Sequence, residues 1–289
     1  MDWPEQPRNV ALKDLPDQLR EDCRPRREGA PRYLYALLDM GRIQGGQRTE
    51  VVNKLRLSAL GTPLLDDPEF QELKEHGALL MTGVGATCGR PQCTDSPTTG
   101  GNGTTGDHRS PLLHALGASN GDTVSAWVVS ELGTQALARH FAQAAFAFGL
   151  DGTRFLLRYY DPLILPVLSR LADKAWREWF FAPVVSWWYP VATPREEAWA
   201  CIEGGSPGAP PQAAPLVLDE ALWDALASDP LPYRLLNTVE QMFPSFAGAA
   251  CYGVRLAKVE ELLQAGKQDG LTSPEALTAY VLARLGEAK

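Results

Sequence analysis

The sequence predicts an α/β lobe, with a mixed, partly parallel sheet and flanking helices, followed by an all-α lobe at the C-terminal end. Short apolar runs alternate with helical stripes over residues 30–203, which is typical of strands separated by helices. A stretch rich in Gly, Pro and Ala interrupts the chain at 204–215. Beyond it, residues 216–289 carry only helical periodicity. These three observations define the two lobes.

The first lobe follows a polar leader, residues 1–29, which we expect to pack loosely or to carry one helix. Apolar runs of strand length then recur along the chain, each bounded by polar or turn-forming residues. These runs predict strands at Arg32–Met40, Gly77–Thr82, Thr123–Ser130 and Thr153–Tyr160. Helical spacing predicts the elements between them at Thr49–Leu60, Pro68–Glu75 and Glu131–Phe148.

Two segments break this rhythm. Residues 83–110 are dense in Gly, Thr, Ser and Pro and bury too little apolar area to offset their ordering entropy, which predicts a mobile insertion. The stretch 204–215 has the composition of an interlobe linker. The apolar stripes of 216–289 then require a small helical bundle, whose last helix opens on a capping box of Thr272 and Glu275.

Composition narrows the functional classes. The chain has 289 residues, of which 45% are hydrophobic and 21% charged, as in ordinary globular proteins. A net charge of −8 argues against nucleic-acid binding, which requires a basic face. The N-terminal residues lack the apolar region of a secretory signal, and no run approaches the roughly 18 apolar residues of a membrane span. We therefore expect a cytoplasmic protein with no membrane partner.

Few side chains stand at catalytic or metal-ligand spacing. Cys88 and Cys93 with His108 outline a zinc site, but their spacing is long and a fourth ligand is not evident. A zinc- or cysteine-dependent hydrolase is the enzymatic alternative, and thiols on a flexible loop are the structural one. The Gly-rich segments lack the Lys-Ser/Thr of a phosphate loop. His140 lies on an apolar helix face, as core histidines do. The sequence favours a protein without enzymatic activity, cofactor or metal.

The most informative segment is 153–190, where a strand runs into a helix. Asp161 is a good N-cap, and Pro162 suits the first helical turn because its missing N–H needs no partner there. Pro166 lies deeper and predicts a kink or a restart of the helix. Pro183 ends the apolar stripe that follows.

Arg158 and the aromatic tail of this segment are the candidates for contacts. We expect Arg158 to pair with a carboxylate, with Asp39 as the candidate. Large rings commonly fill cores, but Trp and Tyr are also enriched in interface hot spots. Because neighbours in a strand face opposite sides, one of Trp187 and Trp188 is expected to point away from the main core.

Short motifs in one order resemble a known family. Along the chain they are Tyr35–Asp39, Trp127–Ser130, Leu157–Pro162, Phe180–Val184 and Ala250–Val254. Together they resemble the type VI secretion effector chaperones, also called adaptors, which carry the domain of unknown function numbered 4123. The last motif looks like a helix-ending element of that family. Departures from the family pattern are Leu163 for Arg, Ala182 for Gly, and Phe141-Ala142 for Leu-Arg.

The resemblance implies a cytoplasmic, non-enzymatic bacterial adaptor that binds a toxic effector and helps to load it onto the trimeric spike (VgrG-type) protein. An immunity-type inhibitor of the effector is a further alternative. The implied structural motif comprises Asp39, His140, Asp161, Pro162, Pro183, Tyr252 and Gly253. The expected partner contacts are Arg158, Tyr160, Phe181, Trp187, Trp188 and Tyr189. We expect the α/β lobe to be a rigid platform and the helical lobe to supply a groove or clamp for the effector.

Overall fold

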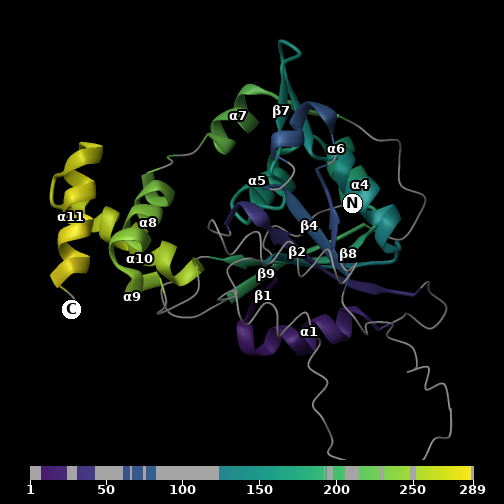
Figure 1. Ribbon diagram of the computed structural model, residues 1–289, viewed down its shortest axis with the longest axis horizontal. Coiled ribbons are helices and arrows are strands. Elements are labelled where there is room, and N and C mark those ends of the chain that lie inside the picture. Colours follow the sequence, from purple (N-terminus) through teal and green to yellow (C-terminus); the bar gives the residue numbers. More distant parts are fainter. Residues whose placement is uncertain are drawn as a thin grey trace, which may run out of the picture.

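A computed structural model shows two sheets, the helices that cover them, and a C-terminal group of helices (Figure 1). It describes residues 8–24, 31–42, 61–65, 67–73, 76–82, 124–191, 193, 198–205, 215–227, 229, 231–247 and 252–287. The predicted helix at Thr49–Leu60 and the predicted insertion at 83–110 lie outside these residues. Within the described part of the chain, no helix is long and apolar enough to cross a membrane.

The larger sheet has seven strands in the order β1-β9-β8-β5-β2-β4-β3. Their bounds are Arg8–Ala11 for β1, Ala198–Glu203 for β9, Val184–Val191 for β8, Val124–Ser130 for β5, Tyr33–Asp39 for β2, Ala78–Thr82 for β4 and Gly61–Pro63 for β3. Each neighbouring pair is antiparallel. The predicted parallel component is therefore wrong for this sheet. Among the described strands, parallel pairing occurs between β6 (Phe146–Gly149) and β10 (Leu216–Leu218) of the smaller sheet.

The central strands are buried on both faces, and alternate residues enter two different cores. Tyr35 and Leu37 of β2 lie in the larger core, whereas Ala36 and Leu38 lie in the second. Helices α4 (Thr134–Gln143), α5 (Ile164–Leu171) and α6 (Lys174–Phe180) cover the larger core, and α1 (Leu15–Asp22) covers the second (Figure 1). Burial on both faces gives each strand a continuous apolar run, the pattern that is usual for parallel sheets.

The N-terminal segment carries one helix, as one of the two predicted alternatives had it, and it also forms an edge strand of the sheet. Strand β1 pairs with β9 at the sheet edge, and a 3-10 turn, η1 (Leu12–Asp14), leads into α1. Leu15 and Leu19 of α1 are buried in the second core. The Trp188 Nε1 donates a hydrogen bond to the Asp22 Oδ2 at 2.7 Å, and the Arg8 guanidinium lies 4.8 Å from the Trp188 ring centroid. Residues 8–24 thus cover the second core and shield it from solvent.

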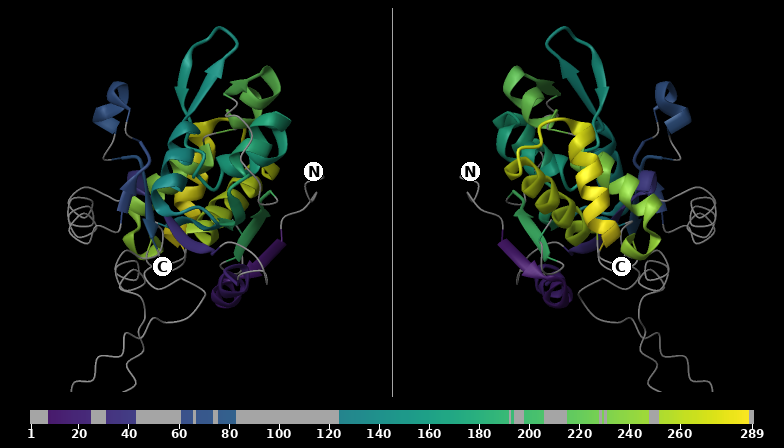
Figure 2. Two further views of the ribbon diagram at one scale, coloured as in Figure 1. Left: turned by 90° about the vertical axis from the view of Figure 1, so that its right-hand side faces the viewer. Right: turned by 90° about the vertical axis from the view of Figure 1, so that its left-hand side faces the viewer.

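The smaller sheet has the order β10-β6-β7, with β7 at Arg154–Leu156. Strands β6 and β7 form a hairpin that projects beyond the helices around it (Figure 2). Strand β10 and the following helix α7 (Glu220–Leu226) pack with this hairpin and with α5, and Leu216, Leu218 and Leu222 enter the larger core. Residues 216–226, predicted to belong to the helical lobe, therefore belong with the α/β part.

Gly204 and Gly205, predicted as the start of a linker, are packed against the turn between α6 and β8. The Gly204 N–H donates to the Val185 carbonyl at 3.1 Å, and the Gly205 N–H donates to the Phe181 carbonyl at 3.0 Å. These bonds continue the pairing of β8 with β9 past Glu203. The rest of the predicted linker up to residue 214 lies outside the described residues.

The C-terminal helices are confirmed from residue 231 onward. They are α8 (Leu231–Met242), α9 (Pro244–Ala247), α10 (Tyr252–Gln268) and α11 (Pro274–Glu287), with a shared core of leucines and valines. Tyr252 and Gly253 begin α10, whereas the family resemblance placed them at a helix end. The Ala276 N–H donates to the Ser273 Oγ at 3.1 Å, so Ser273 takes the capping position predicted for Thr272.

Three other predicted elements are shorter than expected. The helix predicted at Glu131–Phe148 is limited to α4, and Phe146–Phe148 belong to strand β6. The helix predicted at Pro68–Glu75 is a kinked 3-10 segment, η3 (Pro68–Leu73), and a further 3-10 turn, η2 (Met40–Arg42), follows β2. The strand predicted at Thr153–Tyr160 is limited to β7. It ends before Leu157, whose N–H donates a hydrogen bond to the Ala145 carbonyl at 2.8 Å.

Candidate functional site

The strand-to-helix junction at 157–163 links the sheet to the C-terminal helices. The Arg158 Nη2 donates to the Asp39 Oδ2 at 2.6 Å, and Asp39, at the end of β2, is fully buried. The second carboxylate, Asp161 Oδ2, lies 3.9 Å from the same nitrogen. Leu163 packs against the core of the C-terminal helices. The predicted pairing of Arg158 with Asp39 is confirmed, and it serves the structure of the junction.

Asp161 caps this junction, but the helix begins later than predicted. The Leu163 N–H donates to the Asp161 Oδ1 at 3.0 Å, and the Asp161 carbonyl accepts from the N–H groups of Ile164 and Leu165. Since α5 begins at Ile164, Pro162 lies in the preceding turn. Pro166 then falls in the first turn of α5, so the helix restarts near this residue after the turn that Asp161 opens, which is one of the two outcomes predicted for it.

Replacing Arg158 by Gln is expected to lower the free energy of unfolding by about 1–2 kcal/mol. The buried Asp39 carboxylate would lose a charge-assisted hydrogen bond, while the partial exposure of Arg158 moderates the cost. Chemical denaturation measures the difference. Arg139→Gln, at an exposed position in α4, is the matched control and should change stability by less than about 0.5 kcal/mol. Equal effects of the two variants would contradict a structural ion pair.

The rings predicted to contact a partner lie in the core. Phe181, Trp187 and Trp188 have no exposed side-chain area, and Tyr189 and Tyr160 are buried as well. Trp187 and Trp188 face opposite sides of β8, as strand neighbours do, but each side is a core. In this conformation Phe181, Trp187 and Trp188 offer a surface partner no area, and Tyr160 and Tyr189 offer little. Of the six predicted contacts, Arg158 is the exposed one, at 45%.

His140 is a core histidine, as its position on an apolar helix face predicted. Its Nε2 lies 2.9 Å from the Phe180 carbonyl oxygen, and its ring centroid lies 4.7 Å from that of Trp179. Because a carbonyl only accepts, Nε2 carries the proton of the neutral ring. Burial lowers the pKa of His140 below its usual value. Nearby, the Ser130 Oγ donates to the Pro183 carbonyl at 2.6 Å and fixes the turn before β8.

The lowered pKa of His140 makes stability depend on pH. The unfolded chain takes up the proton first as the pH falls, so this contribution is complete above the ordinary value of 6.5 and declines below it. We expect the free energy of unfolding to fall more steeply below about pH 6.5 in the wild type than in His140→Gln. Gln135→Ala, at an exposed position of the same helix, removes no titratable group and should retain the wild-type slope. Coincident pH profiles of the wild type and His140→Gln would refute this assignment.

A different set of apolar side chains is exposed where the β6–β7 hairpin meets α7. Leu150 at the hairpin tip is 78% exposed, and Trp223 of α7 is 45% exposed. The rings of Phe155 and Trp223 meet edge to face, with centroids 5.2 Å apart. We call this region the hairpin surface. It comprises Leu150, Asp151, Phe155, Leu218, Asp219, Glu220 and Trp223.

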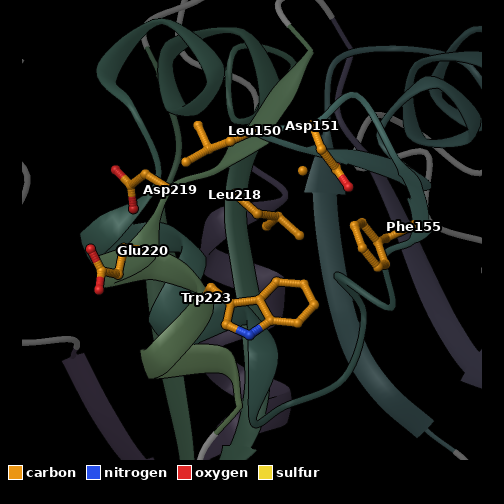
Figure 3. Close-up of a pocket in the computed structure, with 8 residues that line it drawn as sticks. Leu150, Asp151, Phe155, Leu218, Asp219, Glu220 and Trp223 are labelled. Atoms are coloured by element: carbon orange, nitrogen blue, oxygen red, sulfur yellow. The ribbon is translucent and has the colours of Figure 1, made fainter.

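Two hollows adjoin at the hairpin surface. The first has a volume of about 320 Å³ and is lined by the hairpin surface together with Gly149. In Figure 3, Asp151 and Phe155 lie on one side of it, Asp219, Glu220 and Trp223 on the other, and Leu218 between them. The second hollow, of about 420 Å³, extends to Arg158 and Asp161 of the junction. The hollows share Phe155, Leu218 and Trp223, so those side chains connect the exposed surface to the family motif.

Hydrogen bonds within the hairpin hold its tip in one conformation. The Gly149 N–H donates to the Thr153 carbonyl at 2.8 Å, and Gly152 has a φ of +82°, which favours glycine. The Thr153 N–H and Oγ1 donate to the two Asp151 carboxylate oxygens at 2.9 and 2.7 Å. These bonds lower the pKa of Asp151 and keep it ionised. Leu150 is therefore presented on an ordered turn.

The acids of the first hollow are not balanced by bases that line it. Asp151, Asp219 and Glu220 line the hollow, and none of its lining residues is basic. The nearby Arg154 guanidinium donates to the Asp67 Oδ2 at 2.6 Å and lies 3.6 Å from the Phe146 ring centroid. An apolar hollow with an acidic rim is suited to binding a complementary side chain.

The sequence did not identify the hairpin surface. Its members come from two places far apart in the chain, and Trp223 appeared only as part of a helical stripe. Cys88, Cys93 and His108, the zinc ligands of the alternative hypothesis, lie outside the described residues. Among the residues that the structure does describe, no group of three or more His, Cys, Asp or Glu side chains is placed to hold a metal ion.

The fold and the hairpin surface define an α+β protein with helices at its C-terminal end and an exposed apolar surface with a hollow. The chain belongs to the family described as Domain of unknown function (DUF4123), which matches residues 34–178, half of its length. The match contains the junction and the β6–β7 hairpin but neither β10 nor α7. Neither the curated proteins nor the solved structures gave a match.

Proposed function

We propose that this protein is a cytoplasmic adaptor of type VI secretion, which binds an effector and helps to load it onto the spike (VgrG-type) protein without catalysis. Membership of the DUF4123 family is the observation that carries the proposal. The motifs at Tyr35–Asp39 and Leu157–Pro162, which resemble those of the effector chaperones, lie within the matched residues.

The hairpin surface supports a binding role. Exposed Trp and Leu side chains around an apolar hollow with a polar rim are the usual components of a protein interface. The hairpin turn is held by its own hydrogen bonds, so little conformational freedom would be lost on binding. We therefore place the effector contact on the α/β part of the chain, whereas the sequence placed a groove in the helical lobe.

Co-expression with the products of the neighbouring genes tests the proposal. We expect a purified complex of this chain with a neighbouring effector, and a higher soluble yield of that effector than in its absence. A third component, the spike protein, should then join the complex. Failure to recover any complex at micromolar concentrations would count against an adaptor.

The same experiment separates the adaptor from the other hypotheses. An immunity-type inhibitor would rescue cells from the toxicity of the effector without supporting its secretion. Stoichiometric zinc in the purified chain, lost on replacing Cys88 or Cys93 by Ser, would favour the hydrolase.

A further inference from the structure

The hairpin surface combines apolar exposure with a charge of one sign. Its two most exposed apolar side chains, Leu150 and Trp223, stand on different elements, the hairpin tip and α7. Asp151 and Glu220 stand beside them on the same two elements. Each wall of the first hollow therefore carries both an apolar side chain and a carboxylate.

This arrangement of carboxylates favours a partner side chain with a positive charge. A partner carboxylate would meet three acids and no base among the lining residues, and the net charge of −8 adds a long-range repulsion. A Lys or Arg side chain would be attracted by the same groups. Asp151 contributes at physiological pH, because its hydrogen bonds from Thr153 stabilise the charged form.

The half-exposed indole adds a second attraction for a cation. Trp is the aromatic side chain that binds cations best, and Trp223 lies in the first turn of α7 together with Glu220, directly after the N-cap residue Asp219. The Asp219 Oδ1 accepts from the Leu222 N–H at 2.8 Å and fixes the start of this helix. A guanidinium over the exposed indole would therefore lie near fixed negative charge.

Resting on the adaptor function proposed above, we infer that the hairpin surface binds a basic–apolar segment of the effector, one in which a Lys or Arg side chain adjoins a large apolar side chain. The cation occupies the acidic rim beside Trp223, and the apolar side chain packs between Leu150, Phe155 and Leu218.

Two exposed substitutions with matched controls test the inference on the purified complex. Leu150→Ala removes the apolar contact at the hairpin tip, and Leu171→Ala does the same at an exposed leucine of α5. Glu220→Lys reverses a charge in the first turn of α7, and Glu275→Lys reverses one in the first turn of α11. All four side chains are exposed, so thermal unfolding should show that each variant folds as the wild type does.

We expect Leu150→Ala to weaken the Kd for the co-purified effector roughly tenfold, because most of the apolar area that this side chain buries in the complex is lost. Glu220→Lys should slow association roughly tenfold at low salt and flatten the dependence of the Kd on salt concentration. The controls should stay within about twofold of the wild type. A wild type that binds the effector while both test variants bind equally well would overturn the inference alone. A wild type that binds no neighbouring product would overturn the adaptor function, and the inference with it.

Photo-crosslinking identifies the occupant directly. A p-benzoyl-phenylalanine introduced in place of Leu150 should crosslink to one effector segment, whereas the same group in place of Leu171 should not. Mass spectrometry of the crosslinked peptide should find Lys or Arg within a few residues of an aromatic or aliphatic side chain. Crosslinking to an acidic segment would overturn the proposed chemistry.

Discussion

Replacing Trp187 by Ala is expected to lower the free energy of unfolding by about 3–5 kcal/mol, the cost of removing a large ring from a packed core. Trp187 has no exposed area, and its ring centroid lies 5.3 Å from that of Phe141 and 5.7 Å from that of Phe180. The substitution would leave a cavity beneath α4 and α6 that these rings cannot close without moving. Chemical denaturation with a two-state fit measures the loss.

Trp223→Ala is the matched control, because it removes the same ring from a site that is 45% exposed. We expect a smaller loss of stability from this control, and we expect it to impair effector binding. The two tryptophans thus separate stability from binding. A stable Trp187→Ala protein with impaired binding would restore the interpretation of Trp187 as a contact residue.

Replacing Gly204 by Ala is expected to destabilise the protein by about 1–3 kcal/mol. A Cβ at this position would lie 1.7 Å from the Val184 carbonyl oxygen and 2.5 Å from its carbon. Because both atoms belong to the backbone of β8, relief requires β8 and β9 to separate. The hydrogen bond from the Gly204 N–H to the Val185 carbonyl would be strained as well.

The neighbouring Gly205 offers a control with the same change. A Cβ there would meet its nearest atom, the Ala182 Cα, at 3.4 Å, which is an ordinary contact. We expect Gly205→Ala to change the midpoint of thermal unfolding by much less than Gly204→Ala. If the two substitutions had equal effects, close packing against β8 would not be the reason for glycine at position 204.

Local patterns in the sequence located the strands that are buried on both faces. The runs at Arg32–Met40, Gly77–Thr82 and Thr123–Ser130 became β2, β4 and β5 with boundaries shifted by a residue or less at most ends. Every residue of β5 is buried. An apolar run of this kind indicates that a strand is buried on both faces, but it does not indicate whether the strand pairs in a parallel or an antiparallel way.

Strand direction and the edge strands depend on contacts between distant segments. Strand β1 is polar and partly exposed, and its place is set by pairing with β9. Strand β10 has three residues, and its place is set by pairing with β6. Neither of these two strand pairings can be recognised from the residues of one segment alone. For the same reason the aromatic tail could not be assigned: Trp187 and Trp188 alternate as predicted, and the N-terminal segment covers the side that the sequence left open.

The hairpin surface could not be predicted from the sequence for a related reason. Leu150 lies in a turn and Trp223 in a short helix, and no motif joins them. By contrast, Arg158 and Asp39 could be paired in advance, because a strand that ends in an acid and a junction that carries a base belong to one family pattern. The sequence was informative where a family motif was present, and it was silent where the surface is built from segments that no motif joins.

The pairing of β1 with β9 has a consequence for the order in which the protein assembles during synthesis. The register sets Arg8 opposite Cys201, so the first described strand to leave the ribosome cannot pair until nearly all of the large sheet has been made. Until then the Trp188 side of the sheet lacks the cover that α1 provides. Contacts between residues so far apart in the chain form slowly, and exposed apolar surface favours aggregation meanwhile. We therefore expect the docking of residues 8–24 to be a late step that completes the second core.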